Sequence, residues 1–180
     1  WKTKVIETMR KGIASSMKRF NVEVLQGEAK FEGPGKVSVK GTTYEGDNIL
    51  IATGSSAAVI PIPGADSPKV VTNREILQIE EMPKKLVVIG GGVIGVEFAS
   101  LFASFGVEVE VIEMLDEIIP MMDPEHSKLL RRALKKQVTF TLGAKVESID
   151  DGKVTYSVAG KDSKDGKGTP EKKSSEADLI

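Results

Sequence analysis

Three glycines, spaced as Gly90-x-Gly92-x-x-Gly95, constrain the fold of this 180-residue chain more than any other feature. They follow directly on an apolar, β-branched run at residues 84–89, and a helical pattern with an apolar stripe follows at residues 93–105. In a strand–turn–helix unit, the first glycine permits the tight turn, the second lets a ligand approach the backbone, and the third lets the helix pack closely on its strand. The spacing therefore predicts a strand, a glycine turn and a helix in direct succession.

The predicted turn from Gly90 to Gly95 has the properties of a phosphate-binding site. Besides the three glycines it contains Gly91, Val93 and Ile94. The first turn of a helix offers backbone N–H groups without partners in the helix, together with a partial positive charge of roughly half a unit. A pyrophosphate fits there without a lysine. We therefore expect these residues to bind the pyrophosphate of a dinucleotide.

An acidic residue, Glu113, follows the next apolar run, residues 107–112. In dinucleotide-binding folds, a carboxylate about 20 residues after the glycines accepts hydrogen bonds from the adenosine ribose and repels the 2′-phosphate of NADP. Residues 107–117 contain no arginine or lysine that could bind such a phosphate, so the pattern favours NAD. The alternative is that the glycines form only a tight turn and that Glu113 is a solvated strand end.

The order of the predicted elements indicates an α/β fold. A helix at residues 125–136 and a strand at residues 138–142 complete a strand–helix–strand–helix–strand pattern. That pattern is typical of the mononucleotide-binding half of a doubly wound, Rossmann-like fold with a parallel sheet. Glu108 and Glu110 alternate with valines in the second strand, whereas a central parallel strand is normally apolar. One face of that strand is therefore expected to be wet or covered by a polar layer.

The C-terminal part of the chain is expected to be less regular. Residues 145–149 and 153–158 predict a β-hairpin because they flank an Asp-Asp-Gly turn. Residues 160–175 are rich in Gly, Lys and Ser and predict a solvated loop. Residues 178–180 look like the beginning of another strand.

The N-terminal part predicts a separate unit. Residues 4–20 show the periodicity of an amphipathic helix. Short runs separated by glycines then predict a β-meander: residues 22–25, 29–31, 36–39 and 48–51. Residues 56–68 contain three prolines and predict an extended segment between domains. We therefore expect one domain at residues 1–59 and a second at residues 60–180 that is truncated at its last strand.

The composition excludes several classes of protein. With 25 basic and 26 acidic side chains the chain is not a dedicated nucleic-acid binder, and its apolar stretches are too short to span a membrane. Because cysteine is absent, a disulfide scaffold, a thiolate metal site and a cysteine nucleophile are excluded within this chain. His126 is interpreted as a surface residue and Asp150-Asp151 as part of a turn. We therefore expect no catalytic residue and no metal site in this chain.

Three longer segments carry a resemblance to a known family. They are VVIGGGVIGVEFA at residues 87–99, VIEMLDEIIP at residues 111–120 and ILIATGS at residues 49–55. Together they closely resemble the dihydrolipoamide dehydrogenases, which are FAD- and NAD-dependent pyridine nucleotide-disulfide oxidoreductases. The resemblance extends over essentially the whole chain but covers only the middle of such a protein. The family's first flavin motif, redox-active cysteine pair and dimerisation domain with the catalytic histidine are not present in this sequence.

The resemblance implies a cofactor role for both predicted domains. Residues 1–59 match the later part of an FAD-binding domain, and residues 60–180 match an NAD-binding domain with a parallel sheet and a β-meander. In the first domain, Thr53, Gly54 and Ser55 match the segment that passes the flavin. Ala29 matches a position near the adenine of FAD, where many relatives have glycine.

In the second domain, the resemblance assigns the turn from Gly90 to Gly95 to the pyrophosphate of NAD and Glu113 to the ribose. It also places Val146 against the adenine and Glu97 beside the nicotinamide. From the sequence alone, Glu97 could equally be a first-turn acid that the helix dipole favours.

For the parent protein, the resemblance implies a cytoplasmic, homodimeric flavoprotein that oxidises dihydrolipoyl groups and transfers hydride through FAD to NAD. Such a protein can serve a 2-oxoacid dehydrogenase or glycine-cleavage complex. The alternatives are a related NADH oxidase, coenzyme A disulfide reductase or mercuric reductase, or a non-catalytic dinucleotide-binding fragment. The chain by itself is expected to be inactive, not to retain FAD, and to bind a small-molecule nucleotide at most weakly.

Overall fold

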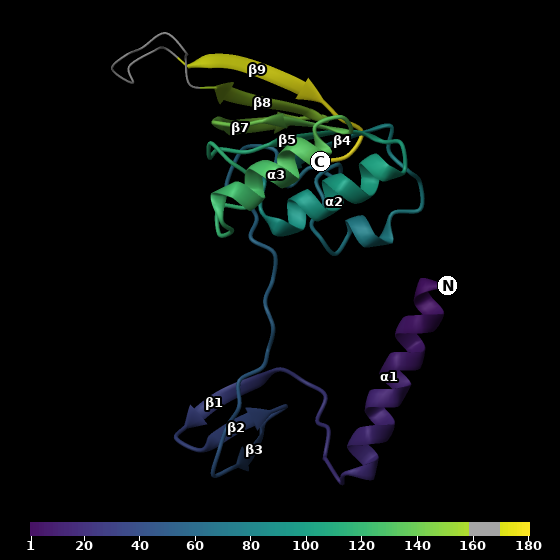
Figure 1. Cartoon of the computed structure of the whole chain (residues 1–180). Coiled ribbons are helices and arrows are strands. Elements are labelled where there is room, and N and C mark those ends of the chain that lie inside the picture. The colour runs from purple at the N-terminus through teal and green to yellow at the C-terminus, as the bar shows by residue number, and fades with distance from the viewer. Residues whose placement is uncertain (159–169) are drawn as a thin grey trace. The chain divides into compact units, whose positions relative to one another are not determined.

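A computed structural model describes residues 1–158 and 170–180 (Figure 1). The chain divides into two compact units, Trp1–Ser55 and Ser56–Ile180. The glycine turn and Glu113 both lie in the second unit.

The first unit consists of one helix and one small sheet. The helix α1 (Lys2–Arg19) confirms the predicted amphipathic helix, and none of its residues is buried. The sheet is antiparallel, with the order β1 (Ala29–Gly33), β2 (Lys36–Val39) and β3 (Thr42–Glu45). A meander is thus present, but its strands differ in part from those predicted.

The predicted strands at residues 22–25 and 48–51 are wrong, because both segments lack regular structure. The strand β3 occupies a polar stretch that shows no apolar run. Its pairing follows from the preceding turn, in which Lys40 and Gly41 have φ angles of 51° and 81°. Two consecutive residues with positive φ form the tight hairpin turn that matches strand twist. This turn places Thr42 opposite Val39, and the backbone register follows from there.

The second unit contains the predicted strand–helix–strand–helix–strand pattern. The strands β4 (Lys85–Ile89), β5 (Glu108–Ile112) and β6 (Val138–Thr141) form a parallel sheet in the order β4-β5-β6. The helix α2 (Val93–Ser104) connects the first two strands, and α3 (Pro124–Leu134) lies between the second and third. A short 3₁₀ helix, η1 (Ile76–Gln78), precedes the sheet.

The strand β4 has partners on both sides. On one side it pairs with β5, and on the other Leu86 forms a parallel bridge with Leu179. The Val87 N–H donates to the Leu179 carbonyl at 3.1 Å. Residues 178–180 therefore lie beside β4, as expected for the start of a strand. The glycine turn that follows β4 is consequently at an interior position of the sheet.

A second, antiparallel sheet covers one face of the parallel sheet. Its order is β7 (Ala144–Asp150), β8 (Lys153–Val158) and β9 (Glu171–Glu176), and the predicted hairpin of β7 and β8 is confirmed. The prediction of a loop at residues 160–175 is wrong for residues 171–175, because they belong to β9. Pairing with β8 accounts for this strand, since only Ser175 among its side chains is buried. The rest of that prediction falls on residues 159–169, outside the described residues.

The core of the second unit lies on both faces of the parallel sheet. On one face, Leu86 and Val111 pack with Ala99 and Phe102 of α2. On the other face, a second set of buried residues joins the two sheets: Val87, Ile112, Val146, Ile149, Val154 and Tyr156. Burial on both faces explains the continuous apolar run of β4. The resulting order of layers is helix, parallel sheet and antiparallel sheet (Figure 1).

Glu110 provides the polar layer expected on β5. Its carboxylate accepts hydrogen bonds from the hydroxyls of Thr141 at 2.7 Å and Ser175 at 2.6 Å, and a longer one from Tyr156 at 3.5 Å. Burial and the nearby Glu110 charge raise the pKa of the Tyr156 hydroxyl. Glu108, on the same strand, is exposed and forms an ion pair with Lys85 at 3.1 Å. A carboxylate between the sheets is thus solvated by hydroxyl groups.

Replacing Glu110 with alanine is expected to lower the free energy of unfolding by about 1–3 kcal/mol, because the buried Ser175 hydroxyl loses its acceptor. The matched change Glu108→Ala removes only an exposed ion pair and is expected to cost less than about 1 kcal/mol. Urea unfolding of the two variants measures this difference. Equal losses would contradict a structural role for the hydroxyl layer.

Candidate functional site

The glycine turn joins the carboxyl end of β4 to the start of α2, and each glycine has a different steric environment. Gly90 has a φ of +105°, a conformation that side chains rarely adopt. A Cβ atom on Gly95 would overlap the Gly90 carbonyl oxygen and contact Val88. A Cβ on Gly92 would meet nothing within 4 Å. The turn is therefore tight at Gly90, closely packed at Gly95 and open at Gly92.

The open side of this turn is the N-terminal end of α2. The first hydrogen bond of the helix runs from the Val96 N–H to the Gly92 carbonyl at 3.0 Å. The N–H groups of residues 93–95 therefore have no partner within the helix. Val93 and Ile94 are about half exposed, at 49% and 55%. Backbone N–H groups at an accessible helix start, together with the helix dipole, favour a bound anion. The geometry suits a phosphate group.

Glu113 directly follows β5 at its carboxyl end, and its side chain faces the glycine turn. Its carboxylate accepts hydrogen bonds from the N–H of Gly91 at 2.5 Å and the N–H of Leu115 at 2.7 Å. The side chain is buried, with Glu113 only 9% exposed. A carboxylate has about four acceptor positions, so it can accept further hydrogen bonds from hydroxyl groups.

Residues 113–122 form a loop, the 113–122 loop, that is anchored to α3. Glu117 and Arg131 form a two-pronged ion pair with N–O distances of 2.7 and 2.9 Å. Hydrogen bonding by the Arg131 guanidinium lowers the pKa of Glu117, and the same pairing raises the pKa of Arg131. Further along the loop, the Ile119 N–H donates to the Gly91 carbonyl at 2.8 Å.

These loop contacts were missed by sequence reasoning. The contact of the Ile119 N–H cannot be inferred from the residue type, because every residue except proline has a backbone N–H. The Glu117–Arg131 pair spans a loop and a helix, so no fixed spacing reveals it. The only available signal was the resemblance of residues 111–120 to the family segment.

The other predicted NAD residues of the second unit have different environments. Glu97 is exposed on α2, but it lies just beyond the first turn of the helix and is therefore not the first-turn acid that the sequence allowed as an alternative. Val146 is 8% exposed and packs in the core with Ile112, so it offers little free surface. The structure therefore brings Glu113 to the glycine turn but keeps Val146 largely within the core.

The four predicted FAD residues lie in the first unit. Ala29 begins β1, and the segment Thr53, Gly54 and Ser55 has no regular structure. All four residues are exposed. Gly54 has a φ of +76°, which favours glycine at this position.

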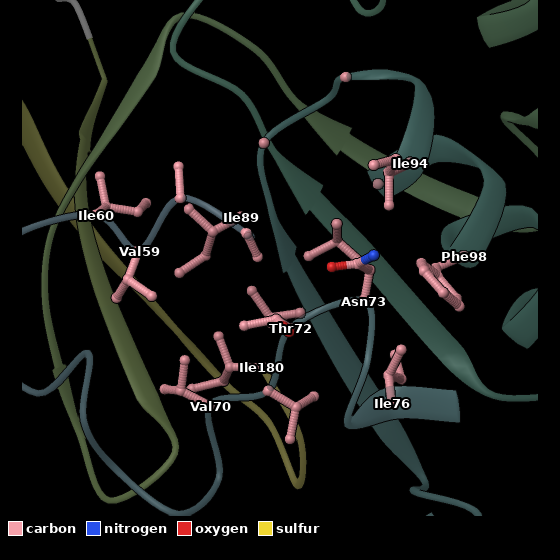
Figure 2. A pocket seen from close by; sticks show the side chains of 18 of the residues that line it. Val59, Ile60, Val70, Thr72, Asn73, Ile76, Ile89, Ile94, Phe98 and Ile180 are labelled. Carbon is pink, nitrogen blue, oxygen red and sulfur yellow. The ribbon is translucent and has the colours of Figure 1, made fainter. Parts of the chain in front are cut away.

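A cavity of about 580 Å³ begins at the glycine turn and follows β4 (Figure 2). Its wall is mostly apolar and includes Val59, Ile60 and Ile94, with Thr72 and Asn73 as polar members. Val59 and Ile60 belong to the proline-rich segment that was expected only to connect two domains. Their role in the wall was not predicted, although two adjacent apolar residues in that segment were a possible signal.

The described residues contain no group of three or more His, Cys, Asp or Glu side chains that could hold a metal ion. His126 is exposed on α3. In the same part of the chain, no helix combines the length and apolar character needed to cross a membrane.

Comparisons with known proteins identify the family. The family model described as pyridine nucleotide-disulphide oxidoreductase matches residues 3–179, and the chain belongs to this family. The dihydrolipoyl dehydrogenase of Acholeplasma laidlawii is 42% identical over 163 residues, which are 88% of this chain and 48% of that protein. The dihydrolipoyl dehydrogenase of Mycoplasma genitalium is 38% identical over 164 residues, which are 88% of this chain and 36% of that protein. The chain thus spans about half or less of these relatives.

Solved structures show the same kinship. The HOCl-induced flavoprotein disulfide reductase RclA from Escherichia coli has a TM-score of 0.81 and 30% identity, covering 98% of this chain and 39% of that one. The water-forming NADH oxidase from Lactobacillus brevis, bound to NADH, has a TM-score of 0.66 and 26% identity, and the match covers 84% of this chain and 35% of that one. The Rossmann-like α/β fold inferred from the sequence is confirmed.

The different steric environments of two glycines can be tested by mutation. Gly95→Ala is expected to lower the free energy of unfolding by about 1–3 kcal/mol, because its methyl group overlaps the Gly90 carbonyl. Gly92→Ala is the matched control, and its effect is expected to stay within about 0.5 kcal/mol because its Cβ points into open space. Chemical denaturation of both variants measures these changes. A larger loss of unfolding free energy for Gly92→Ala than for Gly95→Ala would contradict the described turn.

Proposed function

We propose that the second unit binds NAD. The pyrophosphate lies over the turn from Gly90 to Gly95, and Glu113 accepts hydrogen bonds from the adenosine ribose. The observation that carries this proposal is the direction of the Glu113 carboxylate, which faces the glycine turn and bonds to the Gly91 N–H. The NADH-bound structure of the Lactobacillus brevis relative supports it.

In this proposal, Glu97 lies beside the nicotinamide and Val146 contacts the adenine, as the family resemblance implies. The exposure of Glu97 at the start of α2 is compatible with such a contact. Val146 can contribute only its small exposed edge. Bound NAD would supply the hydride acceptor, whereas the residues of this chain bind and orient it.

The first unit is proposed to contribute to an FAD site through Thr53, Gly54, Ser55 and Ala29. Support comes from the family and from the description of RclA as a flavoprotein. Exposed backbone around Gly54 could approach a flavin closely, because glycine presents no side chain.

For the whole protein, we propose a cytoplasmic, homodimeric flavoenzyme that oxidises dihydrolipoyl groups and passes hydride through FAD to NAD. It would serve a 2-oxoacid dehydrogenase or glycine-cleavage complex. The relatives named dihydrolipoyl dehydrogenase support this activity. Because this chain has no cysteine, the dithiol chemistry would require residues that are not in this sequence.

An NADH oxidase is the second candidate, favoured by the structural similarity to the Lactobacillus brevis enzyme. Sequencing of the complete gene separates the two. A Cys-x4-Cys pair before this segment and a histidine after it would support the dihydrolipoyl dehydrogenase. A single cysteine would favour an oxidase or a coenzyme A disulfide reductase.

The cofactor preference tests the role of Glu113. In the complete protein, Glu113→Arg is expected to shift the ratio of NAD to NADP affinity toward NADP by about tenfold or more, because it removes a charged acceptor and a repulsive charge. Both affinities can fall, since the Gly91 N–H also loses its acceptor. The ratio of the two dissociation constants is therefore the measurement.

Glu108→Arg is the matched control, because it makes the same charge change at the opposite, exposed end of β5. Its NAD to NADP ratio is expected to equal that of the unmodified protein. Equal affinities for NAD and NADP before any substitution would contradict the proposed role of Glu113.

The 180-residue chain alone is expected neither to retain FAD nor to reduce dyes with NADH, and to bind NAD at most weakly. For FAD, the physical reason is the exposed apolar face of α1, which shows that the first unit buries little of its own surface. Flavin absorbance of the purified chain and an NADH–dye assay measure these properties. Dye reduction by this chain would overturn the expectation.

A further inference from the structure

The 113–122 loop holds both backbone polar groups of Gly91. The Gly91 N–H donates to the Glu113 carboxylate, and the Gly91 carbonyl accepts from the Ile119 N–H at 2.8 Å. A peptide group is planar, so a hydrogen bond to one of its atoms restricts the whole plane. The two peptide planes that flank Gly91 are therefore oriented by this loop, in addition to β4 and α2.

Ile119 reaches Gly91 in an unusual backbone conformation. Its φ is +47°, and it is followed by Pro120. For a β-branched residue this region is sterically unfavourable, and such conformations persist only where the surroundings enforce them. Ile119 is 8% exposed and shares a buried cluster with Val96 and Ile118. The unfavourable conformation is thus enforced by packing at the point where the loop contacts the turn.

Ser127 adds a second constraint on Ile119 from α3. Its hydroxyl donates to the Ile119 carbonyl at 3.2 Å, and the side chain is only 3% exposed. The Met122 N–H donates to the same carbonyl at 3.0 Å. Two donors therefore hold the carbonyl of Ile119 while its N–H holds Gly91. The hydrogen bonds form a continuous connection from α3 to the glycine turn.

This connection determines where the Gly92 N–H points. The Gly91 carbonyl and the Gly92 N–H belong to one trans peptide, so they point in opposite directions. A carbonyl held toward Ile119 directs the Gly92 N–H away from the loop, and a Cβ on Gly92 would have open space around it. An anion at this turn would meet an N–H that is already oriented.

We propose that Ile119 and Ser127 are positioning residues for the dinucleotide pyrophosphate, acting through the Gly91 carbonyl without touching the ligand. This inference rests on the proposed NAD binding by the second unit. It predicts that the contribution of Ser127 is made through the phosphates alone. Ligands with and without phosphate should therefore respond differently to its loss.

The test uses Ser127→Ala in the complete flavoprotein, with NAD binding measured by calorimetry and adenosine measured as a competitor. Losing one hydrogen bond in the connection is expected to weaken NAD binding about threefold to tenfold. The inhibition constant of adenosine, which has no phosphate, is expected to change less than twofold. Thermal unfolding of each variant is recorded so that binding is compared well below its melting temperature.

Ser104→Ala is the matched control, because Ser104 also donates to a backbone carbonyl, that of Leu101, but at the far end of α2. It is expected to bind both ligands as the unmodified protein does. Unchanged NAD affinity in Ser127→Ala, or an equal loss for NAD and adenosine, would overturn the positioning role. Failure of the unmodified protein to bind NAD would instead refute the proposed function itself.

Discussion

The hydrogen bonds between Gly91 and the 113–122 loop are the interaction on which the candidate site depends. A glycine turn has few conformational preferences of its own, because glycine adopts both signs of φ with similar ease. The freedom that lets Gly90 adopt a φ of +105° would also let the turn adopt other conformations. Two hydrogen bonds with residues outside the turn remove that freedom: the Gly91 N–H donates to Glu113, and the Gly91 carbonyl accepts from Ile119. Flexibility needed for the tight turn is thus combined with a fixed orientation of its peptide groups.

The layered packing of the second unit places this loop where it can act. The strands β4 and β5 are parallel neighbours, so their carboxyl ends lie side by side and the segments that follow them meet. The faces of the sheet are covered by α2 on one side and by the antiparallel sheet on the other. Glu110 lies on the second face and is solvated by hydroxyls of both sheets, which allows a carboxylate within an otherwise apolar contact.

Much of this arrangement could be predicted from the sequence, but only where residue type carries the information. Glycine spacing, the apolar run of β4 and the acid after β5 predicted the parallel sheet, the turn and the location of Glu113. The strands β3 and β9 were not predicted, because exposed edge strands are specified by backbone pairing and turn geometry, and their side chains are polar. Ile119 was missed for a similar reason, since its contact with the turn uses a backbone N–H. The cavity wall at Val59 and Ile60 depends on tertiary folding of an irregular segment.

The surroundings of Glu113 also bear on why a carboxylate there would discriminate between dinucleotides. Both of its oxygens accept hydrogen bonds from backbone N–H groups, those of Gly91 and Leu115. Arg131, which holds the same loop, has its guanidinium bonded to both oxygens of Glu117. A 2′-phosphate would therefore meet a negative charge while this guanidinium remains committed to another carboxylate. In the proposed NAD complex, a ribose hydroxyl would instead meet an acceptor that needs no rearrangement, so the arrangement that orients the glycine turn would also favour the nucleotide without the extra phosphate.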